Sequence, residues 1–200
     1  MTEQIPVNKE VENAVRYVTF EELYTPRLRL RKLTMADAAL YYGRIGSNPN
    51  VTKYMLFSPH QDISESVASI EKALRRYREG KCYRFCIALK ETDELIGVIE
   101  PLRFDEENSS CSFAYMLAEE FWGQGYGTEA LTAVLDFVFY KMEMERVEAD
   151  HMAENAASGA VMRKAGMIFQ KVLPGKYEKE GIIHDAVCYA LTRKQWKNRV

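Results

Sequence analysis

The sequence predicts a single α+β domain, and three observations predict it. Some segments alternate apolar and polar residues, as strands do, whereas others repeat apolar residues every three or four positions, as helices do. These segments follow the order strand, two helices, three strands, helix, strand, helix, two strands, which is not a regular alternation. No repeat, low-complexity tract or linker divides the 200 residues, of which 47% are hydrophobic. One shared core is therefore expected.

The first elements set the boundary of the domain. Residues 1–24 are interpreted as an N-terminal arm, and residues 25–200 as the domain. Residues 27–33 alternate basic residues with leucine, which predicts a half-buried strand. A Thr-x-x-Asp pattern opens a predicted helix at 34–46, and an Asp-x-x-Glu pattern opens a second at 62–80. Both helices are expected to end at a glycine.

The remaining elements complete one sheet. Turn residues at 92–93 and 105–109 predict that the first three of the following strands form an antiparallel meander. A helix is expected after Gly127, and another from Asn155 to Gly166. The predicted strands are 83–90, 95–103, 110–117, 146–150, 167–172 and 182–191.

The turn between the strand 110–117 and its helix is the most informative segment. Gly123, Gly125 and Gly127 allow the backbone to approach a ligand closely. The helix that follows offers free N–H groups and the positive end of its dipole. The segment lacks the Gly-Lys-Ser/Thr ending of a nucleoside-triphosphate loop and the uneven glycine spacing of a dinucleotide fold. It is interpreted as a diphosphate site of another kind.

Four segments resemble the GNAT acetyltransferase superfamily. The segment 117–131 resembles its motif A, with Gly125 and Gly127 at fixed positions. Trp122, where Arg or Gln is usual, is similar to the Rim-type (RimJ/RimL-like) branch. The segment 155–167 resembles motif B, and 25–33 and His184-Asp185 are further matches. The resemblance covers residues 25–195.

The resemblance implies the GNAT fold and its donor. That fold is a central mixed, mostly antiparallel, twisted sheet of about seven strands, splayed at the cofactor cleft, with about four helices on both faces. The donor is acetyl-coenzyme A, whose pantetheine lies in the gap between diverging strands. The residues implied to bind it are Met116, Leu117, Trp122, Gly123, Gln124, Gly125, Tyr126, Gly127, Thr128, Asn155 and Ser158.

The resemblance also implies catalytic roles. The Leu117 N–H is the expected donor to the thioester oxygen. Many members carry a tyrosine seven residues after the motif B asparagine, where this chain has Met162. Ser158 is therefore assigned the role of general acid toward the thiolate. The residues themselves leave open that Ser158 only stabilises a first helical turn, and that Leu117 is simply a core residue.

The sequence leaves several candidates for the general base. The glutamate that Rim-type sequences often carry near the start of the motif A strand is missing from Ser110-Cys111-Ser112. Glu100 ends a buried apolar run and is the preferred replacement, with a pKa raised by burial. Tyr115 acting through water, Asp150 at the rim, and ordered water alone are the alternatives.

The expected function is transfer of an acetyl group to a primary amine in a ternary complex. The acceptor is a protein N-terminus or a small molecule, such as a polyamine, an amino sugar or an amino-acid derivative. Two alternatives stay open: an aminoglycoside-type antibiotic acetyltransferase, which the weak net charge disfavours, and an inactive coenzyme-A-binding regulatory module. The loops 47–62 and 174–181 are expected to shape the acceptor site.

Composition limits the other partners and the location. The net charge of −2 and the lack of a basic stripe argue against nucleic acid. No apolar run reaches membrane-spanning length, and the N-terminus does not resemble a signal peptide, so a cytoplasmic protein without a membrane partner is expected. No histidine or cysteine has a second ligand at metal-binding spacing, so no metal is expected. A monomer or a homodimer is compatible with the sequence.

Overall fold

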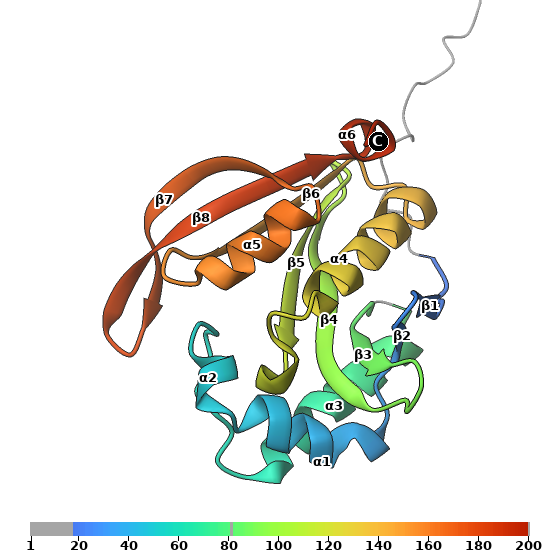
Figure 1. Ribbon diagram of the computed structural model, residues 1–200, viewed down its shortest axis with the longest axis vertical. Helices are drawn as coiled ribbons and strands as arrows, with labels where there is room; N and C mark the ends of the chain where they lie inside the picture. The colour runs from blue at the N-terminus through green and yellow to red at the C-terminus, as the bar shows by residue number, and fades with distance from the viewer. Residues whose placement is uncertain (1–17, 81, 200) are drawn as a thin grey trace, which may run out of the picture.

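One mixed sheet organises the chain. A computed structural model describes residues 18–80 and 82–199. Its strands lie in the order β1-β2-β3-β4-β5-β6-β8-β7, as Figure 1 shows. The strands are β1 (Leu23–Tyr24), β2 (Leu28–Lys32), β3 (Phe85–Leu89), β4 (Leu95–Asp105), β5 (Ser110–Leu117), β6 (Arg146–Met152), β7 (Ile168–Lys179) and β8 (Ile182–Thr192). The helices are α1 (Ala38–Tyr41), α2 (Pro49–Thr52), α3 (Ile63–Arg78), α4 (Tyr126–Asp136), α5 (Ala156–Lys164) and α6 (Arg193–Lys197).

The predicted class and order of elements are confirmed. The described strands number eight, and the one beyond the expected seven is β1, which pairs with β2. The short helices α2 and α6 were also not expected, because elements of four or five residues show no periodicity. The predicted N-terminal arm falls mainly in residues 1–17, outside the described residues. Val18 and Phe20 pack against the core.

Two apolar layers cover the two faces of the sheet. In β3, Phe85 and Ile87 belong to the cluster that contains α4, whereas Cys86 and Ala88 belong to the cluster that contains α1 and α3. This alternation follows from the two-residue period of a strand. Figure 1 shows α4 and α5 on the near side of the sheet and α3 behind β3 and β4. No helix among the described residues is both long and apolar enough to span a lipid bilayer.

The sheet opens between β5 and β6. These strands are parallel and pair only at Ser110–Arg146, Cys111–Val147 and Ser112–Glu148. Beyond that point β5 pairs with β4 alone and β6 with β8 alone. The second half of β5 therefore has one free edge, which is the splay that the family resemblance implied.

A long hairpin borders this opening. β7 and β8 form it, and β8 lies between β6 and β7 (Figure 1). Residues 174–179, expected to be a loop, are part of β7. Near the tip, Lys179 Nζ donates to the carbonyls of Thr52 at 2.8 Å and Lys53 at 3.1 Å. The hairpin and the α2 region thus meet across the sheet.

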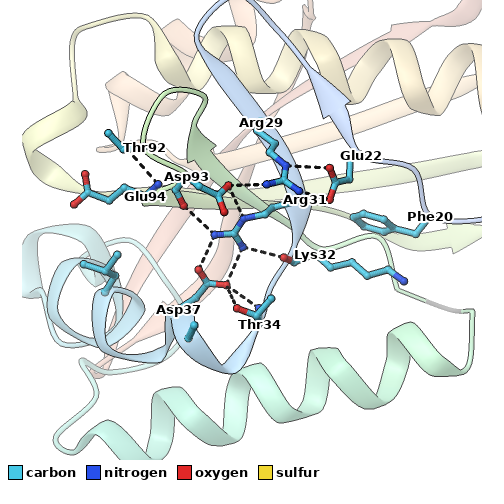
Figure 2. A pocket seen from close by; sticks show the side chains of 12 residues that line it. Phe20, Glu22, Arg29, Arg31, Lys32, Thr34, Asp37, Thr92, Asp93 and Glu94 are labelled. Atoms are coloured by element: carbon cyan, nitrogen blue, oxygen red, sulfur yellow. Dashed lines mark hydrogen bonds and ion pairs between the residues drawn. The ribbon is translucent and has the colours of Figure 1, made fainter.

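The first long strand departs from the half-buried pattern expected for it. Arg31 is only 7% exposed, although alternation with leucine predicted a solvated side chain. Its guanidinium pairs with both oxygens of the buried Asp37, at 2.9 and 2.8 Å, as Figure 2 shows. Arg31 Nε also donates to Asp93 at 3.0 Å. A buried arginine on β2 is possible because these carboxylates neutralise it.

Candidate active site

The glycine turn after β5 has the geometry of an anion site. Gly123 and Gly125 have φ values of 73° and 84°, a region that favours glycine. Gly125 is the N-cap of α4. The first intrahelical bond runs from the Glu129 N–H to the Gly125 carbonyl, at 3.0 Å. The N–H groups of residues 126–128 precede that bond, so the helix itself does not use them.

An apolar cleft of about 340 Å³ adjoins this turn. It lies between the free edge of β5 and the helix α5, and it reaches Tyr54 and Met55 after α2. Among the described residues that line it, Lys164 is the single charged side chain. The predicted binding residues that line it are Met116, Leu117, Trp122, Gly123, Gly125, Gly127, Thr128, Asn155 and Ser158, together with Tyr115.

Two predicted binding residues direct their side chains elsewhere. Gln124 Nε2 donates to the Glu120 carbonyl at 2.7 Å. The ring of Tyr126 lies 4.1 Å from the guanidinium carbon of Arg27. Their side chains therefore support the turn from behind, and only their backbone is available to a ligand at α4.

The end of β5 presents a backbone donor to the cleft. The Ala118 N–H donates to the Ile96 carbonyl at 2.8 Å, so residue 118 bonds toward β4. Neighbouring residues of an antiparallel ladder direct their N–H groups to opposite sides. The Leu117 N–H therefore points to the free edge of β5. The Leu117 carbonyl accepts a 2.7 Å bond from Trp122 Nε1, which holds the indole against the cleft.

Tyr115 and Ser158 meet across the cleft. Tyr115 Oη lies 2.8 Å from Ser158 Oγ and 3.0 Å from the Ser158 carbonyl. Burial raises the pKa of Tyr115 to about 12, against the opposing effect of the Ser158 hydrogen bond. Tyr115 is therefore a proton-bearing phenol at neutral pH. Asn155 Oδ1 accepts the Ser158 N–H at 3.2 Å, so Asn155 is the N-cap that positions Ser158.

Glu100 lies in a second cavity, of about 320 Å³, next to the cleft. The two cavities share Met55, Tyr115 and Met116. Glu100 forms an ion pair with Arg76 at 3.1 Å. It faces α1 and α3 rather than the glycine turn, because Val98, two residues before it on β4, belongs to the cluster that contains those helices.

A third cavity of about 250 Å³ lies under the β7–β8 hairpin. Tyr54, Met55 and Phe57 from the segment 47–62 line it, as does Tyr177 from β7. Asp150, the rim candidate, is bonded to Tyr177 and Lys176. Its carboxylate is therefore engaged with the hairpin. Among the described residues, no group of three or more His, Cys, Asp or Glu could hold a metal ion.

A clamp between the segment just before β2 and α4 holds the turn, and the sequence did not indicate it. Glu129 accepts bonds from Arg27 Nε at 2.7 Å, the Arg27 N–H at 3.0 Å and Thr25 Oγ1 at 2.6 Å. Arg27 Nη1 then donates to the Gln124 carbonyl at 3.0 Å. Burial works to raise the Glu129 pKa, but the bonds from Thr25 and Arg27 outweigh it and hold the pKa below its usual value. The only sequence signal was the position of Arg27 in the matching segment 25–33.

We expect Glu129→Gln to lower the free energy of unfolding by about 1–3 kcal/mol, because one oxygen that accepts charged hydrogen bonds is lost. Urea unfolding measures this. Coenzyme A affinity is expected to fall as well, since Arg27, which bonds to the Gln124 carbonyl, loses the carboxylate that holds it. Glu107→Gln, in an exposed turn, is the matched control and should change neither quantity. Equal stability of the two variants would contradict the role of the clamp.

The family is decided by a sequence match that spans most of the chain. The family described as "Acetyltransferase (GNAT) domain" matches residues 27–168. The chain belongs to the GNAT acetyltransferase family. The family and the fold implied by the sequence are therefore confirmed.

Known acetyltransferases resemble the chain over nearly their whole length. An uncharacterized N-acetyltransferase, p20 of Bacillus licheniformis, is 35% identical over 178 residues, which are 88% of this chain and 98% of p20. Among solved structures, RimL, a ribosomal-protein α-N-acetyltransferase in complex with coenzyme A, has a TM-score of 0.77 at 20% identity and covers 86% of this chain and 98% of its own. Spermidine N-acetyltransferase from Vibrio cholerae, in complex with coenzyme A and spermine, has a TM-score of 0.75 at 19% identity. The match covers 87% of this chain and 100% of the Vibrio cholerae chain. These two structures support the GNAT fold.

Proposed function

We propose that this GNAT protein transfers an acetyl group from acetyl-coenzyme A to a primary amine, directly and in a ternary complex. The observation that carries the proposal is the glycine turn at the N-terminus of α4, opening onto a cleft at the free edge of β5. An extended pantetheine arm beside β5 would continue the sheet, as added strands do. RimL and the spermidine enzyme were solved with coenzyme A, which agrees with this donor.

The chain's residues fit coenzyme A by their chemistry. The N–H groups of residues 126–128 and the glycines beside them suit a pyrophosphate. The apolar walls suit pantetheine, and Lys164 supplies a cation for a ligand that carries several phosphates. The Leu117 N–H, directed to the free edge, is the proposed donor to the thioester oxygen.

The proposed transfer moves two protons. The amine nitrogen bonds to the acetyl carbon, the carbon–sulfur bond breaks, and its electron pair leaves on sulfur. The Ser158 hydroxyl protonates that thiolate and regains a proton from Tyr115, which solvent restores. The amine proton leaves to Glu100, directly or through water, because Glu100 is the carboxylate of the adjoining cavity. The ion pair with Arg76 fixes its position.

Free-thiol release from acetyl-coenzyme A tests the function, across amines that include peptide N-termini, polyamines, aminoglycosides and amino acids. Thiol release that depends on an amine supports the proposal, and the preferred amine separates the acceptor classes. Tight binding of acetyl-coenzyme A without turnover on any amine would instead favour a regulatory module.

Ser158→Ala is expected to lower kcat by about a hundredfold, the scale of one general acid. Tyr115→Phe should lower kcat less, because the Ser158 hydroxyl remains. Ser64→Ala is the matched control, since Ser64 is exposed in the first turn of α3 and should keep the wild-type kcat. If Ser158→Ala turns over like the wild type at every pH, Ser158 is not the acid.

A further inference from the structure

The second cavity contains an arginine that none of the steps above uses. Arg84 directly precedes β3 and lines this cavity together with Glu100. The first residue of β3, Phe85, pairs with Ile99 on the antiparallel β4, so Arg84 and Glu100 are the next residues along the two segments. The cavity reaches Met55, Tyr115 and Met116, which also line the cleft. Its far end therefore lies beyond the place where the acetyl group would be transferred.

The side-chain partners of Arg84 in residues 18–80 and 82–199 are neutral. Nη1 donates to Ser69 Oγ at 3.1 Å, and Nη2 donates to Tyr41 Oη at 2.6 Å. The guanidinium carbon also lies 5.3 Å from the centre of the Tyr41 ring. No ion pair involves Arg84 in the part of the chain that the structure describes. Glu100, the single carboxylate among the described residues that line the cavity, is paired with Arg76 instead.

A half-buried guanidinium without a carboxylate is costly, because it has lost part of its hydration without gaining a counter-charge. Arg31 shows how this chain otherwise handles such a group: it is surrounded by Asp37 and Asp93. At Arg84 no carboxylate of the described residues forms an ion pair, and the guanidinium lines an accessible cavity. The fork of a guanidinium is suited to a carboxylate or a phosphate.

We propose that Arg84 binds an anionic group of the acetyl acceptor, so that the acceptor is a small amine that also carries a carboxylate or a phosphate. This inference rests on the proposed function. Glu100 beside Arg84 offers a site for the amine, so one compact molecule can reach both. A cavity of about 320 Å³ is at the small end of ligand sites, which favours a small molecule over a polypeptide.

Matched amines test this directly. The pairs are β-alanine with β-alaninamide, and O-phosphoethanolamine with ethanolamine, with spermidine as the polycation. We expect kcat/KM to be at least about tenfold higher for the anionic member of a pair, the scale of a charged hydrogen bond. The pair that shows this preference distinguishes a carboxylate from a phosphate. A preference for the neutral amines or for spermidine would overturn the proposal.

Variants of Arg84 separate its role from a structural one. In Arg84→Gln the ratio of kcat/KM between the anionic and the neutral member of the preferred pair should fall to about one, mainly through a change in KM. Arg84→Lys should retain part of the ratio, because it keeps the charge without the fork. Arg78→Gln, an exposed arginine at the end of α3, removes the same charge and should keep the full ratio. A ratio that survives Arg84→Gln would overturn the proposal.

Binding measurements distinguish a failure of the proposed anion site from a failure of the proposed acetyl transfer. Calorimetry with acetyl-coenzyme A shows that each variant is folded and binds its donor. N-acetyl-β-alanine and its amide are then titrated into the complex with coenzyme A. Tighter binding of the acid than of the amide, with the difference lost in Arg84→Gln, supports the anion site. If no amine is turned over while this difference is observed, only the proposed function fails. Equal binding of acid and amide overturns the anion site even if acetyl transfer is observed.

Discussion

Replacing Asp37 with alanine is expected to lower the free energy of unfolding by about 3–5 kcal/mol, because it leaves Arg31 buried without its main counter-ion. The side chains of Arg31 and Asp37 are 9% and 6% exposed. Their two hydrogen bonds are parallel, and the Thr34 N–H adds a third to Asp37 at 2.7 Å. Figure 2 shows Arg31 at the centre of these contacts. Asp93 remains in the variant, but it is half exposed and cannot replace a buried carboxylate.

Two variants test whether the loss of stability comes from the unpaired charge of Arg31. Glu106→Ala, in an exposed turn, should leave the denaturation midpoint unchanged. The double variant Arg31→Met with Asp37→Leu removes both charges and should lose less stability than Asp37→Ala alone. A double variant that is as unstable as the single one would show that packing, and not charge, decides.

The same pair makes stability depend on pH in the acidic range. Burial works to raise the Asp37 pKa, but the bonds from Arg31 and Thr34 prevail and hold it below the ordinary value of 3.8. Because the folded pKa is the lower one, this contribution is fully present above pH 3.8 and is lost as the pH falls below it through the folded pKa. Asp37→Asn should therefore flatten the acid limb of the stability curve.

Gly125→Ala is expected to weaken binding of acetyl-coenzyme A by about tenfold or more. At a φ of 84° a side chain costs about 1–2 kcal/mol. Without a ligand, the variant relaxes this strain by rearranging the turn. Binding must then restore the original geometry, so the cost of the strain is subtracted from the binding free energy. A new Cβ would also lie 3.4 Å from Arg27 Nη2, at the clamp that holds the turn.

Other glycines provide the controls, with calorimetry as the measurement. Gly43→Ala lies in an exposed helical segment, and its Cβ would meet nothing within 4 Å, so affinity should not change. At Gly123 the φ is 73°, and a new Cβ would again meet nothing within 4 Å. Gly123→Ala therefore adds backbone strain without a new contact inside the protein. Wild-type affinity in Gly125→Ala would refute the phosphate-binding role of this turn.

Local patterns in the sequence predicted the longer elements and most of the residues that line the cleft, but not β1, α2 or α6. The capping pairs at 34–37 and 62–65 are present as hydrogen-bonded caps, because capping depends on residues three positions apart. The glycine turn and the Asn155 cap are local in the same sense. Nine of the eleven predicted binding residues line one cleft, since motifs A and B both follow strands that end at the splay.

Tertiary structure decided which charges are paired. Arg27 and Glu129 are 102 residues apart, and no local pattern links them. Arg31 and Arg84 both occur beside apolar strand residues, yet one is neutralised by Asp37 and Asp93 whereas the other faces a cavity without an ion pair among the described residues. The sequence specified strands, caps and turns because these depend on near neighbours. The partner of each buried charge depends on which distant segments the folded sheet brings together.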